Sequence, residues 1–541
     1  MMGDAGLEKL RETIQQRSIF LGKDHPVVSP KGHGQGWLID LRMTLLDGAS
    51  LELIADLFWE RFAGRLPFQV GGLEAGAIPL VVAIAMAGQQ RGTPVNAFVV
   101  RKERKPYGLS KTIEGVLTAD PIVIVDDLIN SGSGMEKVRV VLGEAGHRFR
   151  DLFVVIDYEA EEGRQWLQQY DVGLTSLFRL VEFGLELKPS TPRVARSEFR
   201  EVWRFRSPEP NYFHVVPKST PALDDRRVFF GSDSGVFWAL EQDTGAVAWS
   251  FRVREAGRRN IWSSPAVHAG RVYFGSYDGN VYCLDAEDGR EHWRFTGADW
   301  VGSSPALAPD LNLLFIGLEH AVPGRRGSLA ALDMGTGAKV WELPVCEYLH
   351  GTPLYCSARE AVAVGTNDRD LILADARTGR LIWKFPTKGE IKYAPALDPV
   401  RGSVIVGSFD GKIYVVDLES GRELWSVKTD TVIYSTPLVV GDRAYVVSTD
   451  KHLYVLDLAE RAVITRVHAG AKLYSSPRLI DGRIYFGSTG GLVFELDPER
   501  LLFTGRVQLP DRITNAVAYS ERHRLYYALT YDNQLFALAR A

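Results

Sequence analysis

The sequence has few cysteines and no strong excess of charge of either sign. It contains 3 cysteines in 541 residues, and none has the spacing of zinc ligands, which argues against a disulfide framework or a zinc site. The formal net charge is -4 without any basic tract, so composition does not support a nucleic-acid partner. No apolar run reaches the roughly 18 residues of a membrane-spanning helix. Because the opening residues also lack the pattern of a signal peptide, we expect a cytoplasmic protein without a membrane partner.

The chain is too long for a single hydrophobic core. Its apolar fraction of 45% and charged fraction of 24% are typical of globular proteins. At about 150 residues per domain, several modules are expected. A polar, proline-containing segment at 186–199 separates two regions of different composition. We therefore predict one domain over 1–185 and another over 200–541, joined by a linker.

The run IVIVDDLINSGSGM, from Ile122 to Met135, combines a strand, two acids and a helix start. Four apolar residues predict a buried parallel strand that ends at Asp126 and Asp127. Small residues then begin a helix, where free N–H groups and the helix dipole can bind phosphate. These small residues are Asn130, Ser131, Gly132 and Ser133. The run predicts a phosphate-and-ribose site, although a strand that happens to end in two acids before a helix is the alternative.

This run resembles the signature with which type I phosphoribosyltransferases bind 5-phosphoribosyl 1-pyrophosphate (PRPP). The resemblance implies that Asp126 and Asp127 bind the ribose hydroxyls and that residues 130–133 bind the 5′-phosphate. Asn130 stands where the family usually has Thr or Ser. The resemblance also implies Mg²⁺ as cofactor, held by Asp126 and Asp127 partly through PRPP.

Two further segments resemble loops of the orotate phosphoribosyltransferases. The first, FQVGGLEAGAIP, implies contacts with the pyrophosphate of PRPP from Gly71, Gly72, Glu74 and Gly76. The second, RKERKPYG, resembles the mobile catalytic loop of that family. It implies that Arg101, Lys102 and Lys105 contact pyrophosphate oxygens, with Lys105 as the main catalytic cation. Together with Asp127 they form the predicted catalytic set, since cations closing over the site would stabilise the charge of the departing pyrophosphate.

Two segments of the first region bear on recognition of the base. The segment FLGKDHPVVSPKGHGQGWLIDLR resembles the entry of orotate phosphoribosyltransferases, in which a lysine helps to hold the substrates; Lys23 and Lys31 are both candidates. Tyr158 occupies the position of an arginine that helps that family to recognise its pyrimidine. We therefore assign Tyr158 and Lys23 to base binding and leave orotate itself open.

Strands alternate with helices from Ile39 to Leu180, which predicts an α/β fold with a doubly wound parallel sheet. Ligands of such sheets bind at the carboxyl ends of the strands, where all the candidate loops lie. The family resemblance implies a homodimer formed through this domain, because the mobile loop of orotate phosphoribosyltransferases reaches the site of the neighbouring subunit.

The second region repeats one plan of an SSP-like start, an alternating strand, a GSxDG turn, a strand ending in LD and a strand bearing tryptophan. The tryptophans recur every 42 to 48 residues, the period of a β-propeller blade. They are Trp203, Trp249, Trp293, Trp341, Trp383 and Trp425. The strand EVWRF at 201–205 precedes the first complete repeat and matches the tryptophan strands, so we predict that it closes an eight-bladed ring.

These repeats resemble the PQQ-like, quinoprotein-type propeller repeat. We expect no quinone, because the vicinal cysteine pair and Ca²⁺ ligands of quinone-binding members are not found here. The propeller is expected to serve as a protein-interaction or regulatory module with a protein partner.

The sequence thus predicts a phosphoribosyltransferase that joins PRPP to a nitrogenous base, pyrimidine or orotate-like, and releases pyrophosphate. The alternative is a binding protein that senses PRPP or a nucleotide without turnover and docks a partner through its propeller. A redox enzyme built on the propeller is a third hypothesis.

Overall fold

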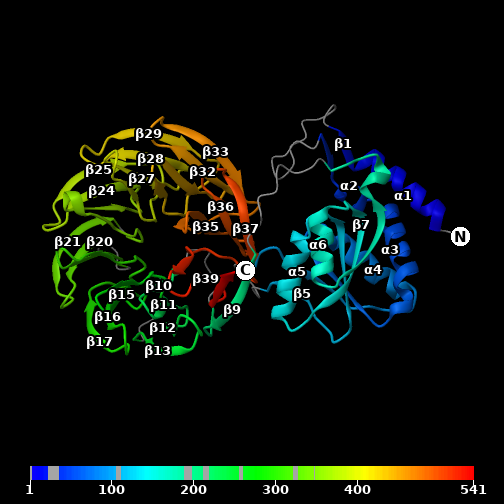
Figure 1. The fold of residues 1–541 in the computed structure, drawn as a ribbon, viewed down its shortest axis with the longest axis horizontal. Helices are drawn as coiled ribbons and strands as arrows, with labels where there is room; N and C mark the ends of the chain where they lie inside the picture. Colours follow the sequence, from blue (N-terminus) through cyan, green and yellow to red (C-terminus); the bar gives the residue numbers. More distant parts are fainter. Residues whose placement is uncertain are drawn as a thin grey trace. The chain divides into compact units, whose positions relative to one another are not determined.

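The computed structural model describes residues 3–21, 36–104, 111–187, 198–210, 219–254, 260–320, 327–346 and 348–541. It divides into two compact units, of which the first contains Met1–Arg193 and the second contains Val194–Val507 and Asp511–Ala541. Figure 1 labels many of their helices and strands. The domain boundaries at 185 and 200 stay predictions, because residues 188–197 lie outside the described ranges.

The first unit is built on a six-stranded sheet with the order β5-β4-β3-β6-β7-β8. The strands are β3 (Gln69–Leu73), β4 (Ala97–Val100), β5 (Ile113–Gly115), β6 (Ile122–Ile129), β7 (Phe149–Asp157) and β8 (Gly173–Arg179). All neighbours run parallel except the edge strand β5, which is antiparallel to β4. A separate antiparallel pair joins β1 (Ile19–Leu21) to β2 (Trp37–Ile39). The predicted doubly wound α/β sheet is confirmed, with one antiparallel edge strand added.

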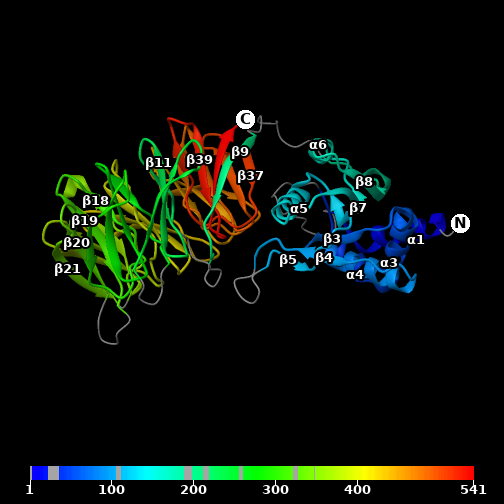
Figure 2. The same ribbon diagram turned by 90° about the horizontal axis from the view of Figure 1, so that it is seen from below.

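Helices cover both faces of this sheet, as Figure 2 shows. They are α1 (Gly3–Arg17), α2 (Arg42–Leu45), α3 (Gly48–Phe62), α4 (Ala77–Gln90), α5 (Ser133–Glu144) and α6 (Glu161–Gln169), with short 3₁₀ turns at Ala63–Arg65 and Leu180–Phe183. Alternate residues of β6 enter different cores. Val123 and Val125 pack with α3 and α4, whereas Ile122 and Ile124 pack with α5. A strand buried on both faces needs apolar side chains at every position, which explains the run IVIV.

The strand β6 is longer than the sequence indicates. Asp126 and Asp127 were expected to end it, but it continues to Ile129. The longer neighbour β7 supplies the reason, since Asp126, Leu128 and Ile129 pair with Val154, Ile156 and Asp157 of that strand. Backbone pairing thus carries the strand through both acids.

The second unit consists of eight four-stranded antiparallel sheets, arranged around a common axis in Figure 1. Blade 1 contains β10 (Ala222–Leu223), β11 (Arg227–Gly231), β12 (Val236–Glu241) and β13 (Val247–Arg252). Blade 2 contains β14 (Ala266–His268), β15 (Arg271–Gly275), β16 (Asn280–Asp285) and β17 (Glu291–Thr296). Blade 3 contains β18 (Ala306–Ala308), β19 (Leu313–Leu318), β20 (Gly327–Asp333) and β21 (Lys339–Cys346). Blade 4 contains β22 (Leu354–Cys356), β23 (Ala361–Gly365), β24 (Asp370–Asp375) and β25 (Leu381–Pro386).

The remaining four blades follow the same order. Blade 5 contains β26 (Ala396–Asp398), β27 (Ser403–Gly407), β28 (Lys412–Asp417) and β29 (Glu423–Lys428). Blade 6 contains β30 (Leu438–Val440), β31 (Arg443–Val447), β32 (His452–Asp457) and β33 (Ala462–His468). Blade 7 contains β34 (Arg478–Ile480), β35 (Arg483–Gly487), β36 (Leu492–Asp497) and β37 (Leu502–Gln508). Blade 8 contains β38 (Ala518–Ser520), β39 (Leu525–Leu529), β40 (Gln534–Arg540) and, from the beginning of the unit, β9 (Phe199–Arg206).

The ring is closed by pairing of β9 with β40. Trp203 of β9 faces Ala537, as Trp249 faces Ala239 within blade 1. The predicted eight-bladed propeller, completed by the strand EVWRF, is confirmed. Closure of this kind leaves no sheet of the ring without its fourth strand.

In five places around the ring, a tryptophan joins one blade to the next. The indole N–H of Trp293 donates to the carbonyl of Met334 at 3.0 Å, and its ring covers Gly337 in the same turn. Gly337 has φ +72°, and an added Cβ would lie 2.4 Å from the ring. The same pair of contacts recurs for Trp203 with Gln242 and Gly245, Trp249 with Ala286 and Gly289, Trp341 with Ala376 and Gly379, and Trp383 with Leu418 and Gly421.

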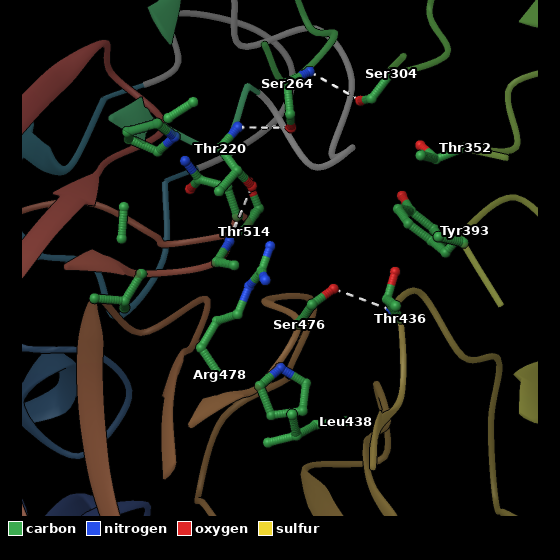
Figure 3. A pocket seen from close by; sticks show the side chains of 18 of the residues that line it. Thr220, Ser264, Ser304, Thr352, Tyr393, Thr436, Leu438, Ser476, Arg478 and Thr514 are labelled. Carbon is green, nitrogen blue, oxygen red and sulfur yellow. Dashed lines mark hydrogen bonds between the residues drawn. The ribbon is translucent and has the colours of Figure 1, made fainter. Parts of the chain in front are cut away.

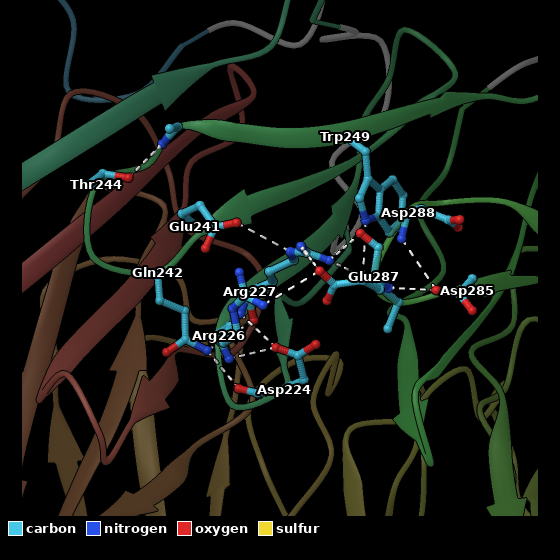
Figure 4. A network of polar contacts seen from close by, with 12 residues as sticks. Asp224, Arg226, Arg227, Glu241, Gln242, Thr244, Trp249, Asp285, Glu287 and Asp288 are labelled. Atoms are coloured by element: carbon cyan, nitrogen blue, oxygen red, sulfur yellow. Dashed lines mark hydrogen bonds and ion pairs between the residues drawn. The ribbon is translucent and has the colours of Figure 1, made fainter.

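Arginines add a second link between blades. Figure 4 shows Arg227, which begins β11 and reaches the turn of the following blade. Its guanidinium donates to the carbonyl of Ala286 at 2.7 Å and pairs with Glu287 at 3.0 Å. Arg443 of β31 reaches the carbonyl of Pro498 in the same manner, at 2.6 Å. These bonds satisfy turn carbonyls that the sheets leave unpaired.

Within the described part of the chain, no helix combines the length and the apolar composition needed to cross a membrane.

Candidate phosphoribosyl site

The two acids of β6 point to opposite faces of the sheet, because successive side chains of a strand alternate. A Cβ added to Gly76, just before α4, would lie 3.0 Å from Asp127 Cγ. One added to Gly134, in the first turn of α5, would lie 4.0 Å from Asp126 Oδ2. Each acid therefore faces the beginning of a different helix, at the carboxyl end of the strands.

Burial dominates the electrostatics of this acid pair. It raises the pKa of Asp126 well above its ordinary value, and the neighbouring charge of Asp127 adds to the increase. Burial also raises the pKa of Asp127. Two hydrogen bonds favour the charged forms, from Asp127 N to Asp126 Oδ1 at 2.9 Å and from Leu128 N to Asp127 Oδ1 at 2.8 Å. A cation bound at this place would relieve the mutual repulsion.

The predicted catalytic loop brings a cation toward the acids. The charge of Lys102 lowers the pKa values of both Asp126 and Asp127, against the effect of burial. Its backbone N–H donates to Glu74 Oε1 at 2.8 Å, and Arg101 lies 3.4 Å from Glu74 Oε2. Glu74 thus ties the loop after β4 to the loop after β3. Lys105 lies outside the described residues.

The glycines of the first loop divide into two groups. Gly71 and Gly72 lie inside β3 and are buried. A Cβ on Gly71 would lie 2.2 Å from the Phe98 ring, and one on Gly72 would lie 2.3 Å from the Val125 carbonyl. Packing of the strand is therefore enough to explain why both positions hold glycine. The contact of Gly71 and Gly72 with PRPP stays a prediction. Gly76 forms the second group, since it lies outside the strand and faces the carboxylate of Asp127.

The segment from Asn130 to Ser133 forms the turn into α5. Gly132 has φ +72°, and a Cβ there would lie 2.8 Å from Trp166 Cγ, so only glycine fits. Ser133 begins the helix and is exposed, and Ser131 Oγ donates to Ser133 Oγ at 3.3 Å. The first N–H groups of a helix have no partner within it, which makes this turn suitable for an anion.

Tyr158 lies beside the acids from the end of β7. It is 9% exposed and packs edge-on against Trp37, with ring centroids 5.8 Å apart. Burial and the charge of Asp127 raise the pKa of Tyr158, which keeps the phenol neutral. Lys23, the other predicted base-binding residue, lies outside the described residues, as does Lys31.

Two residues near the site were not assigned from sequence. Arg42 forms a bidentate pair with Asp40, at 2.7 Å for both bonds. This pair is the main cause that raises the pKa of Arg42, and the charge of Asp127 contributes to it. Trp37 was likewise missed. The DLR sequence at Asp40–Arg42 was the available signal for the first, while nothing local marked the second.

The donor set fits a divalent cation that is shared with a substrate. Within the described ranges, no cluster of three or more His, Cys, Asp or Glu side chains could hold a metal by itself. Mg²⁺ is commonly bound by one or two carboxylates together with substrate phosphates. Asp126 and Asp127 meet that requirement.

Comparisons with known proteins match the two parts of the chain to two different families. The orotate phosphoribosyltransferase of Aquifex aeolicus is 33% identical over 177 residues, which is 32% of this chain and 96% of the relative. The family model described as outer membrane protein assembly factor BamB matches residues 194–352, 325–401 and 399–518. The chain belongs to the orotate phosphoribosyltransferase family through its first unit and to the BamB family through its second.

Solved structures resemble the propeller in fold. BamB from Moraxella catarrhalis aligns with a TM-score of 0.51 at 17% identity, covering 63% of this chain and 98% of that one. A europium-containing methanol dehydrogenase aligns with a TM-score of 0.52 at 13% identity, covering 63% of this chain and 93% of that one. At such low identity, these structures establish the shape of the propeller and not its activity.

Proposed function

We propose that the phosphoribosyltransferase unit transfers the phosphoribosyl group of PRPP to a nitrogenous base and releases pyrophosphate. The observation that carries this proposal is the convergence of Asp127, Gly76 and Lys102 at one edge of the sheet. The family membership of the unit supports it. The acceptor is a pyrimidine or an orotate-like base.

The chain's own groups have separate tasks in this reaction. The acids of β6 hold the ribose hydroxyls and, together with PRPP, Mg²⁺, which would supply charge neutralisation for the pyrophosphate. The turn from Asn130 to Ser133 takes the 5′-phosphate through its N–H groups. Arg101, Lys102 and Lys105 face the pyrophosphate, where positive charge stabilises the departing group. Glu74 fixes the beginning of that cationic loop.

The proposal also covers the propeller, the oligomeric state, the location of the protein and the residues that contact the base. The propeller is a docking or regulatory module for a protein partner, and the first unit forms a homodimer. The protein acts in the cytoplasm. Tyr158 and Lys23 contact the base.

Tyr158 favours a second candidate, binding of PRPP without turnover. It places a buried neutral ring beside Asp127, where the family resemblance expects a cation for the acceptor. In this case the first unit senses PRPP or a nucleotide, and the propeller transmits the bound state to its partner.

Pyrophosphate release from PRPP and Mg²⁺, measured with a panel of bases, tests the proposal. We expect turnover with at least one base and a decrease on the order of 10²-fold or more for Asp127→Asn. Asp151→Asn is the matched control, because Asp151 lies in β7 away from the site and pairs with Arg65 at 2.6 Å. Calorimetric PRPP binding without turnover on any base would favour the sensor, and absence of binding to any phosphoribosyl ligand would exclude both candidates.

A further inference from the structure

The blades of the propeller line a cavity of about 800 Å³ that is open to solvent. The first strands of neighbouring blades, such as β10 and β14 or β22 and β26, contact one another, so they are the innermost strands of the ring. All eight blades contribute to the wall, through Thr220, Ser264, Ser304, Thr352, Tyr393, Thr436, Arg478 and Thr514. Figure 3 shows these side chains around the cavity. Small-molecule sites in proteins typically have volumes of about 300–1,000 Å³.

Hydroxyl groups form a partial ring in this wall. They come from the residue before the proline in the SSP-like starts of six blades, namely Thr220, Ser264, Ser304, Thr352, Thr436 and Ser476. Several accept a backbone N–H from the preceding blade, from Thr220 to Ser264 at 2.9 Å, from Ser264 to Ser304 at 2.9 Å and from Thr436 to Ser476 at 3.0 Å. An oxygen that already accepts keeps its own proton for donation. The ring therefore offers hydrogen-bond donors to a ligand.

Arg478 breaks the pattern of the repeats. The first residue of the innermost strand is Ala222, Ala266, Ala306, Leu354, Ala396, Leu438 or Ala518 in the other seven blades. In blade 7 it is Arg478, which lines the cavity near Thr514 and Ser476 in Figure 3. Repeat packing does not require a guanidinium at this position, since seven blades pack without one.

The guanidinium of Arg478 has no ion-pair or hydrogen-bond partner among the residues that the structure describes. Water reaches it, but the wall removes much of its hydration and lowers its pKa, with no carboxylate to offset this effect. Three other side chains of the wall that can carry a charge have a partner. Lys392 pairs with Glu390 at 2.6 Å, His350 with Glu319 at 3.0 Å, and Asp481 accepts from Tyr519 at 2.8 Å. Glu521 also lines the cavity.

Aromatic rings complete the wall. Tyr393 and Tyr434 have ring centroids 5.7 Å apart, and Trp262 lies 4.8 Å from Tyr277. Such rings bind flat apolar surfaces, whereas an unpaired cation among hydroxyl donors binds an oxyanion. We propose that the propeller cavity binds a small organic anion, a planar ring that carries a carboxylate or phosphate group, with its oxyanion on Arg478.

Four small compounds separate the parts of this proposal: benzoate, phenyl phosphate, inorganic phosphate and phenol. Titration of the full-length protein by calorimetry is expected to show binding of benzoate or phenyl phosphate, and the tighter of the two identifies the preferred anion. Phenol, which has the ring without the charge, should bind at least about tenfold more weakly, as expected for loss of a charge-assisted bond worth about 1.4 kcal/mol or more. Equal binding of phenol would overturn the proposal.

Arg478→Met keeps the length of the side chain and removes its charge. It should weaken binding of the preferred anion at least about tenfold, the equivalent of 1.4 kcal/mol. Arg422→Met is the matched control, because Arg422 lies in an exposed turn outside the cavity wall, and it should bind like the wild type. Arg478→Lys should retain part of the binding, which covers the case in which Arg478→Met fails to fold. Unchanged affinity in Arg478→Met, or absence of binding by all four compounds, would overturn the proposal.

Discussion

Asp126 and Asp127 illustrate how much depends on one residue step along a strand. Because β6 continues through both, Asp127 faces Gly76 before α4, and Asp126 faces Gly134 in α5. The site therefore receives a carboxylate from each face of the sheet. The arrangement has an energetic cost, since both carboxyl groups lose hydration while they repel one another.

We expect Asp126→Asn to stabilise the first unit at neutral pH while it abolishes PRPP binding. Burial and the charge of Asp127 raise the pKa of Asp126, so the folded state holds that proton more tightly than the unfolded chain does. Stability of the wild type then decreases as the pH rises from about 4 through the folded pKa. The gain in free energy of unfolding should be on the order of 1 kcal/mol at pH 7.

Thermal unfolding across a pH series measures this effect. The difference between Asp126→Asn and the wild type should shrink toward pH 3, where the wild-type carboxyl is protonated in both states. Asp151→Asn should show no comparable gain at pH 7. An advantage that is equally large at all pH values would contradict the explanation.

Among the elements, the tight turn between the third and fourth strands of a blade can carry the contact that links it to the previous blade. In five turns a glycine with positive φ lies under a tryptophan ring. In blade 6, which follows the blade of Trp425, the turn has Arg461 instead of glycine at the corresponding position. In blade 7, Glu495 is fully buried instead and accepts from Tyr485 at 2.7 Å, Thr504 at 2.6 Å and Arg540 at 2.8 Å. Polar bonds thus replace the aromatic contact near the closure of the ring.

Gly337→Ala is expected to destabilise the propeller by about 2–5 kcal/mol. The backbone conformation accounts for about 1–2 kcal/mol, and the clash of the new Cβ with Trp293, at 2.4 Å, adds overpacking of about 1–3 kcal/mol. Gly402→Ala is the matched control, because Gly402 has φ +58° and nothing within 4 Å of the added Cβ. Denaturant unfolding of both variants isolates the tryptophan contact, and equal losses would show that it contributes nothing.

At the scale of the whole molecule, ring closure depends on a strand that is distant in sequence. The strand β9 is the first of the second unit, yet it pairs with β40 near the other end of the chain. Trp203 extends the link to blade 1, through its bond to the carbonyl of Gln242 at 3.0 Å. Blade 8 thus joins the two ends of the ring.

Trp203→Ala should therefore lower the stability of the second unit more than Trp425→Ala does. Trp203→Ala is expected to cost about 3 kcal/mol or more, because it removes both the hydrogen bond to Gln242 and the packing of the indole ring on Gly245. Chemical denaturation followed by far-ultraviolet circular dichroism measures the two values. A greater loss for Trp425→Ala would contradict the role of Trp203 in closure.

Much of this architecture could be predicted from sequence, because it depends on local periodicity. The repeated tryptophan strand revealed the blades, and the unmatched EVWRF revealed how the ring closes. The run from Ile122 to Ser133 identified the acids and the phosphate turn by composition and order. Hydrophobic pattern, turn residues and repeat period all act over a few residues, so they can be read along the chain.

Other features required the tertiary structure, because they depend on contacts between distant segments. Pairing with β7 extended β6 and turned its acids to opposite faces. Packing placed Trp37 against Tyr158, residues far apart in the chain. Arg478 is an ordinary surface-type residue in sequence, and only closure of eight blades around one cavity surrounds it with hydroxyls and rings. The sequence alone determined which elements form, whereas the folded chain decided which side chains meet, since only strand register and closure set their directions.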